Sequence, residues 1–289
     1  MVKKTPIGTK FQKQLVKAND QACFSALEHF EFSKILHQLE MTQPNAFTTE
    51  IFCDNPYAAR MYRKGHELRP FGISSAEVGL QMAIIASYEY ADAFSSELQN
   101  FRKAHCPSPA DSIKEDADED TLREKISAWS GEKQVRGFFD TLGYLRHRRN
   151  HFAHGNVELE PAFSRFINQR AHHLNTFWDN DTTKIFGYNF LSRELNSITP
   201  EHAFALINML RVSISHIDET FANSLSYDEL FLAEARSILE APQHRSLPVR
   251  KVASKARTRI HHSYGHRCAS DVALALAQLA VSEFNAATR

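Results

Sequence analysis

Apolar residues recur at every third or fourth position over long stretches of the chain, which is the spacing of amphipathic helices. Only 10 glycines and 10 prolines interrupt these stretches in 289 residues. The pattern therefore predicts an all-α protein. The expected helices span residues 10–40 (as one or two helices), 74–101, 133–154, 161–177, 200–221, 226–240 and 268–286.

Polar and turn-forming residues mark where these helices begin and end. Ser74 and Glu77 have the spacing of a capping box, in which two side chains satisfy backbone N–H groups at a helix start. Pro200 suits the first position of a helix because its missing N–H costs no hydrogen bond there, and Gly155 suits a helix end. Residues 107–120 carry six acids and two prolines, so we expect a solvated loop there.

These elements divide the chain into three parts. We expect residues 1–70 to form an N-terminal helical extension and residues 74–225 to form an up-and-down helical bundle. Residues 226–289 would then form a basic C-terminal helical segment. The stretch at about 157–198 is longer than a minimal bundle needs, and we interpret it as an insertion.

Charge and cysteine usage narrow the class of protein. Lysine and arginine total 34, as do aspartate and glutamate, so the molecule is not a polycation that coats nucleic acid indiscriminately. The four cysteines lie far apart with no C-x-x-C pair, which argues against a zinc ribbon, a redox motif or a disulfide scaffold. The N-terminus lacks the apolar segment of a secretory signal, and no apolar run approaches the ~20 residues that span a bilayer. The sequence therefore predicts a cytoplasmic protein without membrane contact.

One of the expected helices has a charged residue in its apolar seam. Phe138, Leu142, Leu145, Arg149 and Phe152 follow one another at spacings of four, three, four and three, which predicts one buried stripe. A guanidinium is always charged and costs several kcal/mol to desolvate unless it is paired. Arg149 therefore needs a nearby acid or an anionic ligand.

The helix expected at 74–101 has an acid in a corresponding place. This helix is apolar on two faces, as a helix is when it packs between partners or in a dimer interface. Glu89 lies in the second face, beyond Met82 and Ile85. The economical interpretation is that Glu89 and Arg149 face the same polar pocket. In the alternative, Arg149 extends to the surface and Glu89 lies on a solvated face.

Arg149 and Asn150, followed after three residues by His154 and a glycine, resemble the signature of the HEPN superfamily, helical proteins of which many are ribonucleases. The context YLRHRRNHFAHG and an upstream helix with an acid, IIASYEYADAF containing Glu89, fit the same pattern. The resemblance covers roughly residues 74–225. It implies a HEPN-like bundle with additional N- and C-terminal helices, and a homodimer in which two motifs meet in one cleft.

The resemblance also implies a metal-independent endoribonuclease that uses the ribose 2′-hydroxyl as nucleophile and needs no cofactor. His154 would be its general acid and base, since imidazole titrates near neutral pH. Arg149 would clamp the phosphate, and Asn150 would orient it. Glu89 would hold the arginine in place, with His151 as a further supporting residue. The family suggests a toxin or antiphage effector, with an antitoxin or a regulatory protein as partner.

Two basic regions could attract RNA. Arg146, His147 and Arg148 lie beside the motif, where the chemistry would occur, so we expect them to bind RNA. Residues 241–270 hold seven basic residues and no acid. This second region is either a phosphate-binding surface, with a faint similarity to a helix-turn-helix, or a solvated linker, and both interpretations stay open.

Two other functions compete with RNA cleavage. Zinc binding is one, because two histidine pairs have a four-residue spacing: His147–His151 and His262–His266. A zinc site needs a third or fourth ligand, however, and 15 histidines produce such pairs by chance. The other is a non-catalytic HEPN module that binds a nucleotide or a partner such as a nucleotidyltransferase antitoxin. Such modules often lose the arginine or the histidine, and this chain has both.

Overall fold

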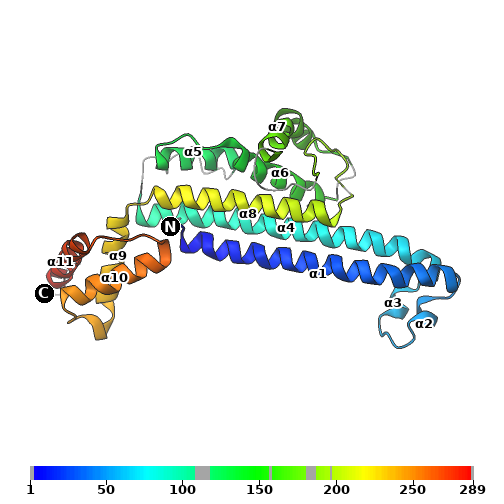
Figure 1. Ribbon diagram of the computed structural model, residues 1–289, viewed down its shortest axis with the longest axis horizontal. Helices are drawn as coiled ribbons and strands as arrows, with labels where there is room; N and C mark the ends of the chain where they lie inside the picture. The colour runs from blue at the N-terminus through cyan, green and yellow to red at the C-terminus, as the bar shows by residue number, and fades with distance from the viewer. Residues whose placement is uncertain (1–2, 108–117, 156–157, 180–186, 196, 288–289) are drawn as a thin grey trace. The chain divides into compact units, whose positions relative to one another are not determined.

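The computed structural model describes residues 3–107, 118–155, 158–179, 187–195 and 197–287. Within these ranges the chain is helical and forms no strand, which confirms the expected all-α class (Figure 1). No helix in this part of the chain combines the length and the apolar character needed to cross a membrane. The helices, in chain order, are α1 (Pro6–Thr42), α2 (Thr48–Ile51), α3 (Ala58–Met61), α4 (Gly65–His105), α5 (Glu119–Ser130), α6 (Arg136–Ala153), α7 (Pro161–Asp179), α8 (Pro200–Asn223), α9 (Tyr227–Glu240), the 3-10 helix η2 (Pro242–His244), α10 (Val249–Tyr264) and α11 (Ser270–Ala287).

The chain folds into two compact units, each assembled from separate stretches of sequence. The long helices α1, α4, α6 and α8 contribute residues to both units. The motif from Arg149 to His154 belongs to the second unit, and the basic region 241–270 belongs to the first. The first unit comprises Met1–Lys13, Ala91–Phe139 and Val212–Arg289, and the second comprises Gln14–Tyr90 and Asp140–Arg211.

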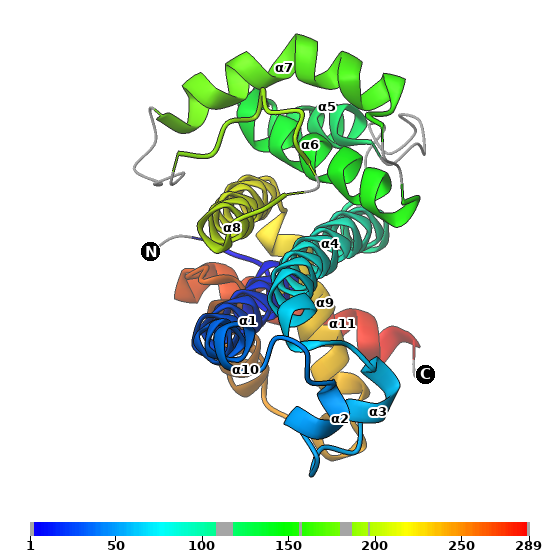
Figure 2. The same cartoon turned by 90° about the vertical axis from the view of Figure 1, so that its right-hand side faces the viewer.

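In the second unit, α1 and the first half of α4 run side by side in opposite directions, joined through α2 and α3 (Figure 2). A small residue lets them approach closely. A Cβ on Gly72 of α4 would come within 2.7 Å of Leu36 Cδ1 on α1. Farther along the pair, a Cβ on Gly79 would lie at an ordinary 3.7 Å from Ser25 Oγ. Of these two positions, Gly72 is therefore the one at which a larger residue would collide with α1.

Helix α7 packs on α6 in the same unit through buried polar contacts. The Trp178 indole N–H donates to Thr141 Oγ1 at 3.0 Å, and the Trp178 side chain is fully buried. Arg170 pairs with Asp140, which is 1% exposed, at 2.8 Å. The described residues of the stretch 157–198 are thus an integral part of the packed unit.

In the first unit, α9, α10 and α11 pack against one another as a group of three helices (Figure 1, orange to red). Two ion pairs cross between them. Arg236 of α9 lies 2.7 Å from Glu283 of α11, and Arg259 of α10 lies 3.1 Å from Glu234 of α9. The buried side of α10 consists of Val252, Ala253, Ala256, Ile260 and Tyr264.

The expected start of the long helix at Ser74 is wrong. Helix α4 begins at Gly65 and includes Pro70, so Ser74 lies inside it and caps nothing. Proline removes one backbone hydrogen bond, but the helix continues through it. The cap forms earlier, where the Lys64 N–H donates to Glu67 Oε2 at 2.8 Å.

Two of the longer helices, α5 and α10, have no counterpart among the expected ones, and neither do the short helices α2, α3 and η2. Helix α5 begins at Glu119, inside the stretch expected to be a loop, with Asp118 accepting a hydrogen bond from the Thr121 N–H at 2.7 Å. Carboxylates favour a helix N-terminus, so the end of the acidic run starts a helix; residues 108–117 lie outside the described ranges. Helix α10 occupies most of the basic region 241–270.

Asp218 of α8 anchors the start of α1 in the first unit. Its carboxylate accepts a hydrogen bond from the Thr5 N–H at 2.9 Å and another from the Thr5 hydroxyl. The Thr5 hydroxyl oxygen in turn accepts from the Gly8 N–H at 2.9 Å. A Cβ on Gly8 would lie 2.1 Å from Asp218 Cγ, so only glycine fits there. Burial raises the pKa of Asp218 from 3.8 to about 6, against the opposing effect of the hydrogen bonds from Thr5.

This arrangement predicts that Asp218 makes folding less favourable as pH rises. The folded protein binds the proton more tightly than the unfolded chain, so the stabilisation is complete below about pH 4 and is lost through about pH 6. Between pH 5 and pH 7.5, the free energy of unfolding should fall by about 1 kcal/mol more in the wild type than in Asp218→Asn. Urea unfolding at the two pH values measures this difference, and equal slopes in both proteins would contradict it.

Candidate active site

Helix α6 carries the motif in its last turn and ends at Ala153. The His154 N–H still donates to the Asn150 carbonyl at 3.1 Å, and Gly155 adopts a φ of +60°. Residues with a Cβ are strained in this left-handed conformation. The expected helix end at Gly155 is therefore confirmed, and His154 is the last side chain before the chain turns.

Arg149 and Glu89 form an ion pair within the second unit. Arg149 Nε donates to Glu89 Oε1 at 2.6 Å, and Arg149 Nη1 donates to Asn150 Oδ1 at 3.0 Å. The expected proximity of Arg149 and Glu89 is thus confirmed. The burial expected for them is wrong, because their side chains are 38% and 47% exposed. Two oxygens hold the guanidinium, and Nη2 has no hydrogen-bond partner among the described residues.

His154 is exposed and stands five positions after Arg149, which corresponds to about 140° around an ideal helix. Three hollows formed by described residues lie elsewhere: on α10, among α1, α4 and the start of α8, and along residues 51–57. A single chain therefore presents both side chains at its surface, and none of these hollows encloses them.

Arg148, which was expected to bind RNA, is buried and 3% exposed. Its Nη1 donates to the Tyr188 hydroxyl at 3.2 Å, and its Nη2 donates to the Leu195 carbonyl at 3.0 Å. The amide of Gln81 on α4 donates to the same carbonyl at 3.3 Å. Arg148 thus joins α6 to the segment after α7, and RNA cannot reach it without unfolding. The expectation is wrong.

Two tyrosines complete the surroundings of Arg148. The hydroxyls of Tyr144 and Tyr188 are hydrogen-bonded to each other, and both rings are buried. Burial, and next the proximity of Tyr144, raise the pKa of Tyr188 well above its ordinary value, so it stays protonated. This cluster was not predicted from the sequence. The four-residue spacing of Tyr144 and Arg148 on α6 was the available signal, and Tyr188 offered none.

The remaining basic residues of the motif differ in accessibility. The ring of His147 stacks on Phe163 of α7 with centroids 5.4 Å apart, and its Nε2 lies 3.4 Å from an Arg146 nitrogen. Both side chains are half-buried, so each keeps part of its surface for a ligand. His151, expected as a supporting residue, is only 2% exposed, and its buried Nδ1 lacks a hydrogen-bond partner. His151 can therefore support the site only by packing under the exposed residues, and it cannot contact a ligand.

The histidines considered for zinc have other surroundings in the structure. His147 stacks on Phe163, and His151 is buried. His266 stacks on Tyr227 with centroids 3.9 Å apart. Throughout the described ranges, no three histidine, cysteine or acidic side chains are grouped so that they could hold a metal ion.

Comparison of the chain with protein-family models, with curated proteins and with solved structures finds no match in any of the three. The likeness to HEPN proteins therefore depends on the motif and its helical setting. It stays a resemblance, and the HEPN-like character of the bundle stays a prediction.

The contacts of Arg148 predict the effect of removing one hydroxyl. Tyr188→Phe leaves a buried guanidinium with one acceptor fewer, which should lower the free energy of unfolding by about 2 kcal/mol. Tyr57→Phe is the matched control, since Tyr57 is 69% exposed and should change stability by less than about 0.5 kcal/mol. Urea unfolding of both variants tests the role of the cluster, and equal stabilities would refute it.

Proposed function

We propose that the protein is an endoribonuclease that acts as a homodimer and cleaves RNA at Arg149, Asn150 and His154 without a metal. The observation that carries this proposal is the state of the Arg149 guanidinium. Glu89 and Asn150 fix its orientation, while it stays 38% exposed with Nη2 available. A guanidinium held in this way is ready to bind a phosphate through its planar fork.

In the proposed reaction, the ribose 2′-oxygen attacks the adjacent phosphorus and the bond from phosphorus to the 5′-oxygen breaks. One imidazole accepts the proton of the 2′-hydroxyl, and a second donates a proton to the departing 5′-oxygen. The products are a 2′,3′-cyclic phosphate and a 5′-hydroxyl. Arg149 stabilises the charge that develops on the phosphate oxygens. Two acid–base groups are needed, and in a two-fold dimer each copy supplies one His154.

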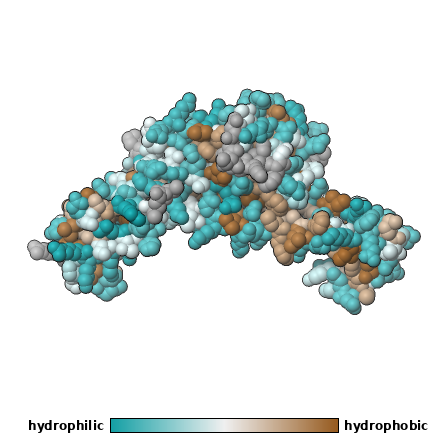
Figure 3. Space-filling view, in the orientation of Figure 1, coloured by the Kyte–Doolittle hydropathy of each residue, from teal (hydrophilic) through white to brown (hydrophobic). Residues whose placement is uncertain are grey.

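The surface of α4 supports the second copy. Phe71, Val78 and Met82 are 48%, 54% and 56% exposed, and they follow one another at spacings of seven and four. Glu89 comes seven residues later on the same stripe. Figure 3 shows apolar surface gathered over this part of α1 and α4. A second copy that covers the stripe would therefore also cover the Glu89–Arg149 pair.

A second candidate function is the non-catalytic module. The observation that favours it is a mainly apolar hollow of about 200 Å³ in the second unit. Such a hollow suits a partner side chain rather than a phosphate. It is lined by Ser25, Ala26 and His29 of α1, by Ile73, Ala76, Glu77 and Leu80 of α4, and by Ile198, Thr199 and Pro200.

The proposed ribonuclease would harm its host if its activity were unrestrained. We therefore include in the proposal a role as a toxin or antiphage effector, with an antitoxin or a regulatory protein as partner.

Cleavage of RNA in EDTA tests the proposed activity. Arg149→Ala and His154→Ala should each lower kcat/KM at least ~100-fold, because a phosphate clamp and an acid–base group each contribute about that much. Arg165→Ala and His172→Ala, exposed on α7, are matched controls that should retain activity. End analysis should find cyclic phosphates. Unchanged cleavage in the Arg149 and His154 variants, with folding intact, would overturn the assignment.

The dimer is tested separately by a charge placed on the apolar stripe. Val78→Asp and Met82→Asp should convert a dimer to a monomer in light scattering, and activity should fall in parallel, since the cleft requires two chains. Leu279→Asp on α11 is the control, because Leu279 is also apolar and 45% exposed. A wild-type protein that is monomeric and fully active at assay concentrations would show that one chain is sufficient.

A further inference from the structure

The exposed side of α10 is a basic surface without a function so far. Its exposed residues include Arg250, Lys251, Lys255, Arg257 and His262. Residues 241–270 contain no acid. Within the stretch interpreted either as a linker or as a phosphate-binding surface, residues 249–264 thus form a helix with basic residues along its exposed side.

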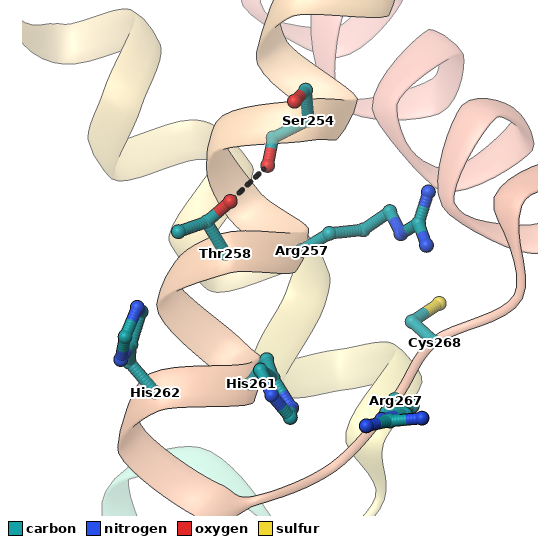
Figure 4. A pocket seen from close by; sticks show the side chains of 7 residues that line it. All are labelled: Ser254, Arg257, Thr258, His261, His262, Arg267 and Cys268. Atoms are coloured by element: carbon teal, nitrogen blue, oxygen red, sulfur yellow. Dashed lines mark hydrogen bonds between the residues drawn. The ribbon is translucent and has the colours of Figure 1, made fainter.

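A hollow of about 450 Å³ lies at the C-terminal half of α10 (Figure 4). Arg257, His261 and Arg267 project toward the same side of it, with Cys268 between the two guanidiniums. Most of these side chains are hydrogen-bond donors, and two carry a permanent positive charge. This combination suits a phosphate oxygen. The complete lining is Ser254, Arg257, Thr258, His261, His262, Arg267 and Cys268.

Local contacts fix the positions of the side chains that line the hollow. Arg257 Nη1 donates to Ser270 Oγ at 2.8 Å, so the guanidinium is positioned in advance. Gly265, with a φ of +67°, ends α10 and turns the chain so that Arg267 returns beside the helix. Burial, and next Asp228, raise the pKa of the Cys268 thiol, so it stays neutral and does not compete as an anion.

Two rows of polar and basic side chains lead along α10 to the hollow. Within each row the residues are spaced four, three and four, so they lie on one side of the helix. The first and last residues of each row are eleven positions apart, or roughly 16 Å at the helical rise. Arg259 is not counted in either row because it is already paired with Glu234. One row is Arg250, Ser254, Arg257 and His261, and the other is Lys251, Lys255, Thr258 and His262.

We propose that this surface, the α10 face, binds a run of phosphodiester groups in the backbone of single-stranded RNA. The choice of RNA rests on the proposed function; the donor set itself recognises phosphates, whichever sugar carries them. No phenylalanine, tyrosine or tryptophan lines the hollow, so it lacks the large aromatic platforms on which successive bases stack. A membrane surface is disfavoured, because α10 exposes no large apolar side chain that could insert into lipid.

The experiment measures binding in a protein that cannot cleave. The binding of a labelled single-stranded RNA to the full-length His154→Ala variant is measured by fluorescence anisotropy over a range of salt concentrations. Adding Arg250→Gln, Lys251→Gln and Arg267→Gln should weaken binding at least ~10-fold at moderate salt. It should lower the slope of log K against log salt by about 2, since each lost phosphate contact removes about 0.7.

The matched control replaces Lys17, Arg60 and Arg165 with glutamine, three exposed cations of the second unit. This triple variant should bind as the parent does, and circular dichroism checks that both triple variants are folded. If the surface recognises only phosphates, the three α10 substitutions should weaken the binding of single-stranded DNA of the same sequence by the same factor as the binding of RNA. Equal RNA binding by both triple variants overturns the proposal. So does binding to anionic vesicles with none to RNA.

The two proposals fail in different ways. Weakened binding in the α10 variant without any cleavage by the wild type would support the α10 face and overturn the nuclease. Cleavage by the wild type with unchanged binding in the α10 variant would do the reverse.

Discussion

The buried guanidinium of Arg148 determines how α6 is set in the second unit. A charge taken out of water costs several kcal/mol unless its donors are satisfied, and here the Tyr188 hydroxyl and the Leu195 carbonyl satisfy two of them. Successive residues of a helix point about 100° apart. Burying Arg148 therefore turns the side chain of Arg149 outward, where Glu89 meets it. The accessible arginine of the candidate site is a consequence of the inaccessible one.

The Arg149–Glu89 pair contributes little to stability. Both side chains are partly exposed, and ion pairs of this kind contribute less than about 1 kcal/mol to stability. Their effect is to restrict the guanidinium to one plane and one direction. A preorganised cation loses little on binding a phosphate, since its side-chain freedom is already restricted.

The chain separates cations that hold the fold from cations that are available to a ligand. Arg236 and Arg259 pair with acids between the last three helices. On the opposite side of α10, a stretch free of acids leaves its cations to solvent. A net charge of zero therefore coexists with a strong local positive potential. Selective contact with a polyanion requires such a distribution, because a uniformly basic protein would bind without discrimination.

The sequence by itself determined the all-α class, most helix positions and the end of α6 at Gly155. These depend on local periodicity and on backbone conformations that few residues adopt. It also indicated the pairing of Glu89 with Arg149, because two charged misfits in apolar seams need each other. Only the tertiary structure decided which of two adjacent arginines is buried. That choice depends on Tyr188 and Leu195, which lie 40 and 47 positions from Arg148 along the chain and reach it only when the segment after α7 folds back onto α6.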